Sequence, residues 1–203
     1  MEQAGTPGTQ LESLISSCME KLAAVCDPRH VIRQFPCTVT GSVVTAGTLT
    51  VNSKGLAGHL RGCTQVYLFA ATLGADADRL ITQRSMADSA EALCIQACAS
   101  AQIENYCNSI EQEPLSSIGS SGFYLRPRFS PGYSDFDIAC QTDILNILQA
   151  HKRIGLTEIN THMLTPLKSV TALIGVSREK TFSEPVKCNL CDKTDCRQRE
   201  VFA

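Results

Sequence analysis

The sequence contains no tryptophan, and aromatic residues make up only 5% of its 203 positions. Aliphatic side chains, alanine and cysteine must therefore fill the core, and a hydrophobic content of 43% is enough for an ordinary globular domain. The chain also lacks any run of the roughly 18 consecutive apolar residues that a membrane-spanning helix needs. Its formal net charge is only -2, without the basic patch typical of nucleic-acid binding. We therefore expect neither a membrane nor a nucleic acid as a partner.

Common catalytic signatures are absent as well. There is no glycine-rich phosphate-binding loop and no Gly-x-Ser-x-Gly elbow, and the four histidines show no metal-binding spacing. Residues 1–10 are polar and lack a basic-then-apolar secretory pattern, so we expect a flexible leader and a cytoplasmic protein. Eleven cysteines in such a chain favour a reducing compartment, where they act as core residues or metal ligands rather than as disulfide partners.

The length favours a single domain, which we expect over residues 11–181, followed by a cysteine-rich tail over 182–203. Apolar spacing predicts a first helix over 11–26, and β-branched runs predict a pair of strands over 37–40 and 48–51. The continuous apolar run over 65–71 is typical of a strand covered on both faces. Further elements are predicted as short helices over 56–61 and 76–82 and as strands over 122–125, 156–159 and 169–176.

The strongest helix signal covers about residues 87–110. One stripe at three- and four-residue steps consists of Ala90, Leu93, Cys94, Ala97, Cys98 and Ala101. Most of these side chains are small, so we expect this face to lie close against a sheet. Cys94 and Cys98 could ligate a metal ion together, but their place in an alanine-rich stripe favours a core role. Early strands paired locally, a long central helix and no regular β-α-β rhythm predict an α+β fold, with a mixed or mainly antiparallel sheet packed against that helix.

The segment Arg128-Phe-Ser-Pro-Gly-Tyr133 has the composition of a rigid turn between a strand and a helix. Its proline fixes one φ angle, and Gly132 permits backbone conformations closed to other residues. Arg128 offers a planar guanidinium that matches a carboxylate, and Tyr133 offers an aromatic face with a hydroxyl. Ser134 is placed to cap the next helix, whose free N–H groups would add a weak anion site. These residues fit either a structural turn or a site for a small zwitterion with an attached ring.

The stretch from Arg126 to Val176 resembles the activation domain of cobalamin-dependent methionine synthase. In that family, an Arg-x-small-Pro-Gly-Tyr turn precedes a helix and binds S-adenosylmethionine. The whole chain beyond about residue 10 is similar to short, stand-alone relatives of methionine synthase. Apart from Arg128–Tyr133, the segments that carry this likeness are Phe69–Gly74, Ile154-Gly155, Met163–Pro166, Lys168–Val170, the cysteine- and alanine-rich helix and the cysteine-rich end.

The resemblance implies a role for each residue of the turn. Arg128 would meet the carboxylate of S-adenosylmethionine, Ser130 and Gly132 would give backbone contacts, and Tyr133 would lie beside the ligand. The family also uses a glutamate on its central helix, for which Glu104 is the best-aligned residue and Glu91 the alternative.

Two positions depart from the family pattern. The run before Met163 usually has a threonine, an acidic residue and a serine, but here it is Ile159-Asn160-Thr161. The acidic position therefore falls on Asn160, unless Thr157-Glu158 takes its place. The early aspartate of the family has no match that can be assigned.

The tail carries Cys188-x-x-Cys191-x-x-x-x-Cys196, which has the spacing of a metal site. Two cysteines separated by two residues can turn both sulfurs toward one ion, and a closed site needs four ligands. The fourth ligand could come from outside the chain or be Cys26, Cys37, Cys63 or Cys140. Zinc and an iron–sulfur cluster both fit the spacing, and a tail of reduced thiols is the alternative.

Three functions remain open at this level. By resemblance, the protein binds S-adenosylmethionine and supports reductive methylation of the cobalamin of a methionine synthase or another corrinoid protein, with a flavodoxin- or ferredoxin-type electron donor. It would then not be catalytic alone. Alternatively, it is an iron–sulfur or zinc-binding accessory protein of corrinoid metabolism with a vestigial S-adenosylmethionine cleft. A third hypothesis is a scaffold that binds a corrinoid protein without any small molecule.

Overall fold

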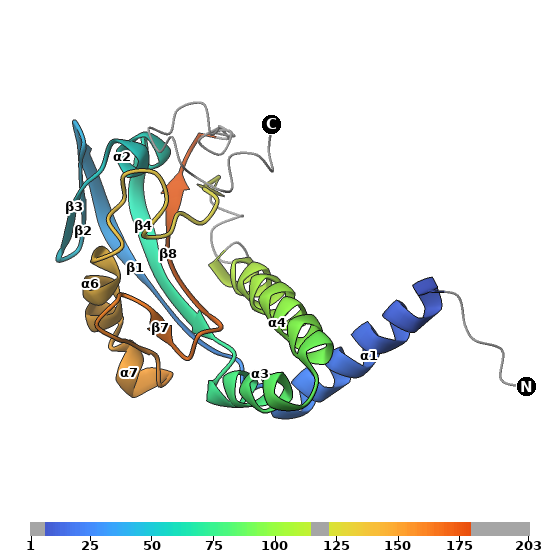
Figure 1. Ribbon diagram of the computed structural model, residues 1–203. Coiled ribbons are helices and arrows are strands. Elements are labelled where there is room, and N and C mark those ends of the chain that lie inside the picture. Colours follow the sequence, from blue (N-terminus) through green and yellow to red (C-terminus); the bar gives the residue numbers. More distant parts are fainter. Residues whose placement is uncertain (1–6, 115–121, 180–203) are drawn as a thin grey trace, which may run out of the picture.

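The computed structural model describes residues 7–114 and 122–179, which are built around one curved six-stranded sheet (Figure 1). The strand order is β3-β2-β1-β4-β8-β5, and a separate hairpin pairs β6 with β7. All of these pairings are antiparallel, which confirms the predicted α+β class and mainly antiparallel sheet. The strands are β1 (Arg29–Thr40), β2 (Val43–Ala46), β3 (Leu49–Asn52), β4 (Cys63–Thr72), β5 (Tyr124–Leu125), β6 (Thr157–Glu158), β7 (Leu164–Thr165) and β8 (Ser169–Ser177).

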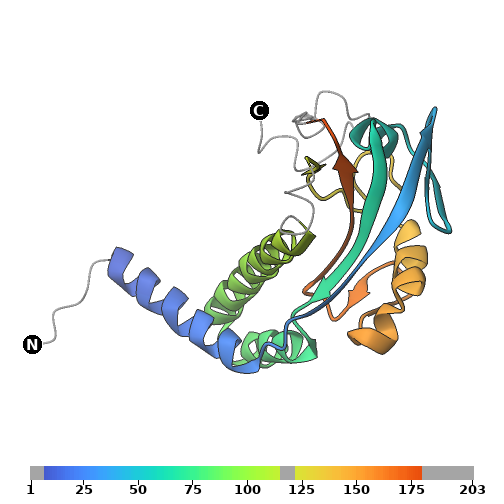
Figure 2. The ribbon, with the colours of Figure 1, turned by 180° about the vertical axis from the view of Figure 1, so that it is seen from behind.

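Helices cover both faces of this sheet, as Figures 1 and 2 show from opposite sides. On one face lie α1 (Pro7–Val25), α3 (Ala75–Ala87) and α4 (Ser89–Ile110). The other face is covered by α6 (Cys140–Leu148) and α7 (Ala150–Arg153), while α2 (Lys54–His59) packs into the same core as α6. The N-terminal part of α1 extends away from the sheet. Among the helices of the described ranges, none is long and apolar enough to cross a membrane.

Strand β4 lies between β1 and β8, and its side chains alternate between two cores. Val66 and Leu68 belong to the core beneath α6, whereas Tyr67 and Phe69 belong to the core beneath α1 and α4. The predicted strand with two covered faces is therefore confirmed, and its unbroken apolar run follows from this double burial.

The first strands differ from the predicted pair. β1 begins at Arg29, well before the predicted start, and β2 is an additional strand between the two expected ones. The first part of β1 pairs with β4, and its end pairs with β2. Arg33 and Gln34 make this first part polar, so its strand conformation depends on pairing with a segment that is distant in the sequence. Local propensity does not reveal such pairing.

The long helix α4 is confirmed, but it faces the sheet with a different stripe. Its buried residues include Ala92, Ile95, Ala99, Ile103 and Cys107. In the predicted stripe, by contrast, the alanines are exposed, Leu93 is 69% exposed, and Cys94 and Cys98 are partly buried beside α1. This helix carries small apolar residues on several of its faces, so more than one stripe of residues has helical spacing. The stripe with the isoleucines buries more apolar area, and it is the one that packs on the sheet.

The predicted N-cap at Ser134 is wrong. Ser134 has a positive φ of 51°, and α6 begins only at Cys140. The neighbouring Asp135 instead caps α2, because its carboxylate accepts hydrogen bonds from the backbone N–H groups of Lys54 at 2.7 Å and Gly55 at 2.9 Å. It also accepts a hydrogen bond from the hydroxyl of Ser53. Through Asp135, the segment between the turn and α6 is therefore hydrogen-bonded to the N-terminus of α2, which is distant in the sequence.

Candidate functional site

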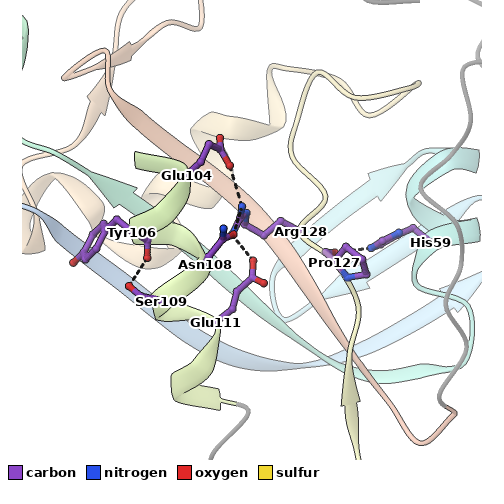
Figure 3. A network of polar contacts seen from close by, with 8 residues as sticks. All are labelled: His59, Glu104, Tyr106, Asn108, Ser109, Glu111, Pro127 and Arg128. Carbon is purple, nitrogen blue, oxygen red and sulfur yellow. Dashed lines mark hydrogen bonds and ion pairs between the residues drawn. The ribbon is translucent and has the colours of Figure 1, made fainter. Parts of the chain in front are cut away.

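Arg128 lies against the C-terminal half of α4 (Figure 3). Its Nη1 donates to Glu111 Oε1 at 2.5 Å, and its Nη2 donates to Glu104 Oε2 and to Asn108 Oδ1, each at 3.0 Å. Residues three and four positions apart share one face of a helix, so these three acceptors point toward the same guanidinium. The structure thus brings together two of the predicted site residues, Arg128 and Glu104.

The two carboxylates of this network have different environments. The side chains of Arg128 and Glu111 are 17% and 23% exposed, whereas that of Glu104 is 61% exposed. Burial raises the pKa of Glu111 above its ordinary value, although the Arg128 guanidinium acts in the opposite direction. With both carboxylates ionised, two negative charges face one positive charge. The network therefore favours an additional cationic group nearby.

The backbone around Arg128 is fixed on both sides. The N–H and C=O groups of Phe129 bond with those of Leu173 on β8, each at 2.9 Å. His59 on α2 donates from Nε2 to the carbonyl of Pro127 at 2.8 Å, and its ring lies 4.9 Å from that of Phe129 (Figure 3). Burial lowers the pKa of His59, so the imidazole is neutral at pH 7. Contacts with β8 and α2 thus fix the backbone on both sides of Arg128 and so position its guanidinium.

The remaining predicted residues form a closed turn beyond Phe129. The N–H of Tyr133 donates to the carbonyl of Ser130 at 3.2 Å, and that of Gly132 donates to the carbonyl of Phe136 at 2.7 Å. The prediction of free helix N-terminal N–H groups at this point is therefore wrong. Gly132 has a φ of 93°, a conformation that other residues rarely adopt. Tyr133 is 64% exposed, so its ring is accessible from solvent.

The alternative glutamate lies elsewhere on α4. Glu91 forms ion pairs with Lys21 on α1 and, at 3.5 Å, with Arg84 on α3. The register of α4 therefore presents Glu104, and not Glu91, to Arg128. Sequence analysis missed Asn108 and Glu111, although their spacing from Glu104 follows a helical face. It also missed His59, which carries no local signal because its partner Pro127 is distant in the sequence.

The two candidates for the family's acidic position lie on the β6–β7 hairpin. Asn160 is exposed in the loop of this hairpin. Glu158 accepts a hydrogen bond from the hydroxyl of Thr142, and its Oε1 lies 3.6 Å from Nδ1 of His162. Of the two, Glu158 thus has the side chain that is tied to the surrounding structure.

The predicted metal ligands Cys188, Cys191 and Cys196 lie outside the described residues. Of the four candidates for an additional ligand, Cys37 and Cys63 are buried in the core with α6, Cys140 packs against that core, and Cys26 packs against the core with α4. Within residues 7–114 and 122–179, no group of three or more His, Cys, Asp or Glu side chains is arranged to hold a metal ion. The zinc or iron–sulfur site remains a prediction.

The sequence matches no protein-family model and no curated protein. Its structure, however, resembles the crystal structure of the MetH reactivation domain bound to AdoHcy, with a TM-score of 0.66 and 16% sequence identity. This likeness covers 88% of the present chain and 69% of the matched chain. The chain therefore has the fold of the MetH reactivation domain, which agrees with the fold implied by the resemblance of its sequence.

Proposed function

We propose that this chain binds S-adenosylmethionine at the Arg128 network and acts as a reactivation module for a cobalamin-dependent methionine synthase or a related corrinoid protein. The position of Arg128 carries the proposal. Its guanidinium is held by the carboxylates of Glu104 on α4 and of Glu111 at the C-cap of α4, in a fold shared with a domain that was solved with AdoHcy. Arg128, Glu104, Ser130, Gly132 and Tyr133 are the residues to which we assign ligand contacts.

The charges of the ligand and of the network complement each other. S-adenosylmethionine carries a carboxylate, an ammonium group and a sulfonium centre. Its carboxylate pairs with the Arg128 guanidinium, which has the planar geometry for two parallel hydrogen bonds. Its two positive centres lie near Glu104 and Glu111, where the carboxylates exceed the guanidinium by one charge. The exposed ring of Tyr133 supplies a surface for the attached base.

Binding requires Arg128 to exchange part of its present hydrogen bonding. Glu104 is the partner that it can release at least cost, because its side chain is 61% exposed and an exposed ion pair contributes only about 0–1 kcal/mol. Glu111 is more buried and holds Arg128 through the other nitrogen, so it keeps the guanidinium in place during the exchange. The released carboxylate is then free to meet a cationic group of the ligand.

Reactivation is the chemistry in which this ligand takes part. Recovery of inactive cob(II)alamin needs one electron and one methyl cation equivalent. S-adenosylmethionine supplies the methyl group and is converted to AdoHcy. We assign the cobalamin to the partner protein and the electron to a flavodoxin- or ferredoxin-type donor. The present chain then binds and orients the methyl donor and is not catalytic alone.

Calorimetric titration of the full chain with S-adenosylmethionine tests the ligand assignment. We expect saturable binding by the wild type, and a Kd about 10- to 100-fold higher for Arg128→Ala, since a hydrogen-bonded charge pair contributes about 1.5–3 kcal/mol. Arg128→Lys keeps the charge but loses the planar fork, so it should bind with intermediate affinity. Arg79→Ala is the matched control, because Arg79 forms an exposed ion pair with Asp76 on α3.

Thermal melting of each variant separates loss of the site from loss of the fold. Absence of saturable wild-type binding at millimolar ligand would refute the ligand assignment. The same conclusion would follow if a folded Arg128→Ala protein bound as tightly as the wild type.

A further inference from the structure

Three thiols meet where α1 packs against α4, away from the residues that contact Arg128. Cys18 on α1 is completely buried, whereas Cys94 and Cys98 on α4 are partly exposed. All three pack in or against the same core. Cys94 occupies the central position, because its thiol lies close enough to those of Cys18 and Cys98 to interact electrostatically with both.

The surroundings of the thiols hold the two helices together. Glu91, on the same face of α4 and one turn before Cys94, forms its ion pair with Lys21 of α1, one turn after Cys18. Arg84 of α3 lies 3.5 Å from the same carboxylate. An ion pair thus holds α1 against α4 one helical turn away from Cys18 and Cys94.

We propose that Cys18 and Cys94 form a reversible disulfide when the chain meets an oxidising small-molecule disulfide such as oxidised glutathione. The exposure of the three thiols determines their roles. A reagent can reach Cys94 from solvent, whereas Cys18 is covered and can react only with a sulfur already inside the protein. Cys94 is therefore the attacking residue, and Cys18 is the resolving residue.

The reaction has two exchange steps. In the first, the Cys94 thiolate attacks one sulfur of oxidised glutathione, the disulfide bond of the reagent breaks, and one glutathione leaves as a thiol after taking up a proton. In the second, Cys18 loses its proton and attacks the Cys94 sulfur, which forms the Cys18–Cys94 bond and releases the second glutathione. Two protein thiols are oxidised, and one molecule of oxidised glutathione is reduced to two thiols.

The second step should be slow near neutral pH. Burial is the largest cause that raises the pKa of Cys18, and it persists when Cys94 carries glutathione, so this pKa lies above the ordinary value of a thiol. Only its thiolate is nucleophilic, so the fraction able to resolve the mixed disulfide grows as the pH rises toward that pKa. We therefore expect glutathione to accumulate first on Cys94 and the protein disulfide to replace it more rapidly at higher pH.

The test uses the reduced full chain, treated with oxidised glutathione under native conditions, alkylated and mapped by peptide mass spectrometry. We expect a peptide pair linking Cys18 to Cys94 in the wild type and in Cys98→Ser. Cys18→Ser should instead retain glutathione on Cys94, and Cys94→Ser should leave Cys18 as an alkylatable thiol after unfolding. Cys140→Ser is the control, since it lies in the other core and should not alter the link.

A melting experiment provides the second measurement. A covalent bond between α1 and α4 closes a long loop, so the oxidised wild type should melt at a higher temperature than the reduced form, and the difference should be absent in Cys18→Ser. The proposal is wrong if Cys18 stays reduced while Cys94 carries a stable glutathione adduct in the wild type. It is equally wrong if Cys18 is linked mainly to another cysteine, or if the link forms only in denaturant.

Discussion

The residue type of Arg128 is known from the sequence, but the contacts of its side chain depend on the fold. From residue types alone, a guanidinium next to a Pro-Gly-Tyr turn fits either a structural turn or a site for a small zwitterion, and it is the family resemblance that favours the ligand site. That the guanidinium is already paired with Glu104, Asn108 and Glu111 does not follow, because it depends on the register of α4 against the turn. The spacing of these acceptors marks a helical face, but nothing in the sequence tells which face meets Arg128.

The excess negative charge of this network leads to a prediction about selectivity between S-adenosylmethionine and AdoHcy. S-adenosylmethionine carries one more positive charge than AdoHcy, at its sulfonium, so Glu104→Gln should weaken binding of S-adenosylmethionine more than that of AdoHcy. Since Glu104 is largely exposed, we expect the ratio of the two Kd values to change only about 3- to 10-fold, as for an interaction of about 1 kcal/mol. Parallel titrations of both ligands measure this ratio, with Glu20→Gln, a change at an exposed position of α1, as the control. An unchanged ratio would mean that Glu104 does not face the sulfonium.

At the scale of elements, the sequence indicates which segments are helices and strands better than it indicates what they contact. The position of α4 and the double burial of β4 follow from apolar periodicity and from an unbroken apolar run. The buried stripe of α4 and the start of β1 do not, because both are decided by partners far along the chain. Ser134 shows the same limit: its residue type suits an N-cap, yet the neighbouring Asp135 caps a helix about 80 positions earlier.

This long-range cap leads to a prediction about stability. Asp135→Ala removes the acceptor for two backbone N–H groups of α2, so the free energy of unfolding should fall by about 1–2 kcal/mol. Burial alone would raise the pKa of Asp135, but hydrogen bonds from Ser53, Gly55 and Lys54 outweigh it and lower the pKa below the ordinary value. The contribution is therefore complete above the unfolded-state pKa of 3.8 and is lost as the pH falls through the lower folded-state value.

Denaturant titrations of the wild type and Asp135→Ala across this acidic range measure the effect. The two curves should converge at the lowest pH, whereas Asp143→Asn, which changes an exposed carboxylate in the first turn of α6, should stay near the wild type throughout. A constant gap between wild type and Asp135→Ala at every pH would show that the carboxylate charge is not what caps α2.

At the scale of the whole molecule, one sheet with two covered faces accounts for both the fold and the place of the site. The core with α4 and the core with α6 share β4 and β8, so a segment bonded to β8 is held in relation to both. Phe129 is bonded to β8 in this way, and it positions Arg128 against α4. The turn also exposes apolar surface, because Tyr133 and Ile138 are 64% and 40% exposed.

The exposed turn leads to a prediction about the proposed partner. If the chain delivers a methyl donor to a cobalamin protein, the surface around the bound ligand must face that protein. Anaerobic capture of a cobalamin-loaded methionine synthase without its own activation domain should therefore increase when S-adenosylmethionine is added. Tyr133→Ala should weaken capture with and without ligand, Arg128→Ala should abolish only the ligand-dependent increase, and Arg79→Ala should behave as the wild type. Ligand binding in calorimetry together with no capture of the partner under any condition would keep the ligand site and refute the reactivation role, because a methyl donor must reach the cobalt.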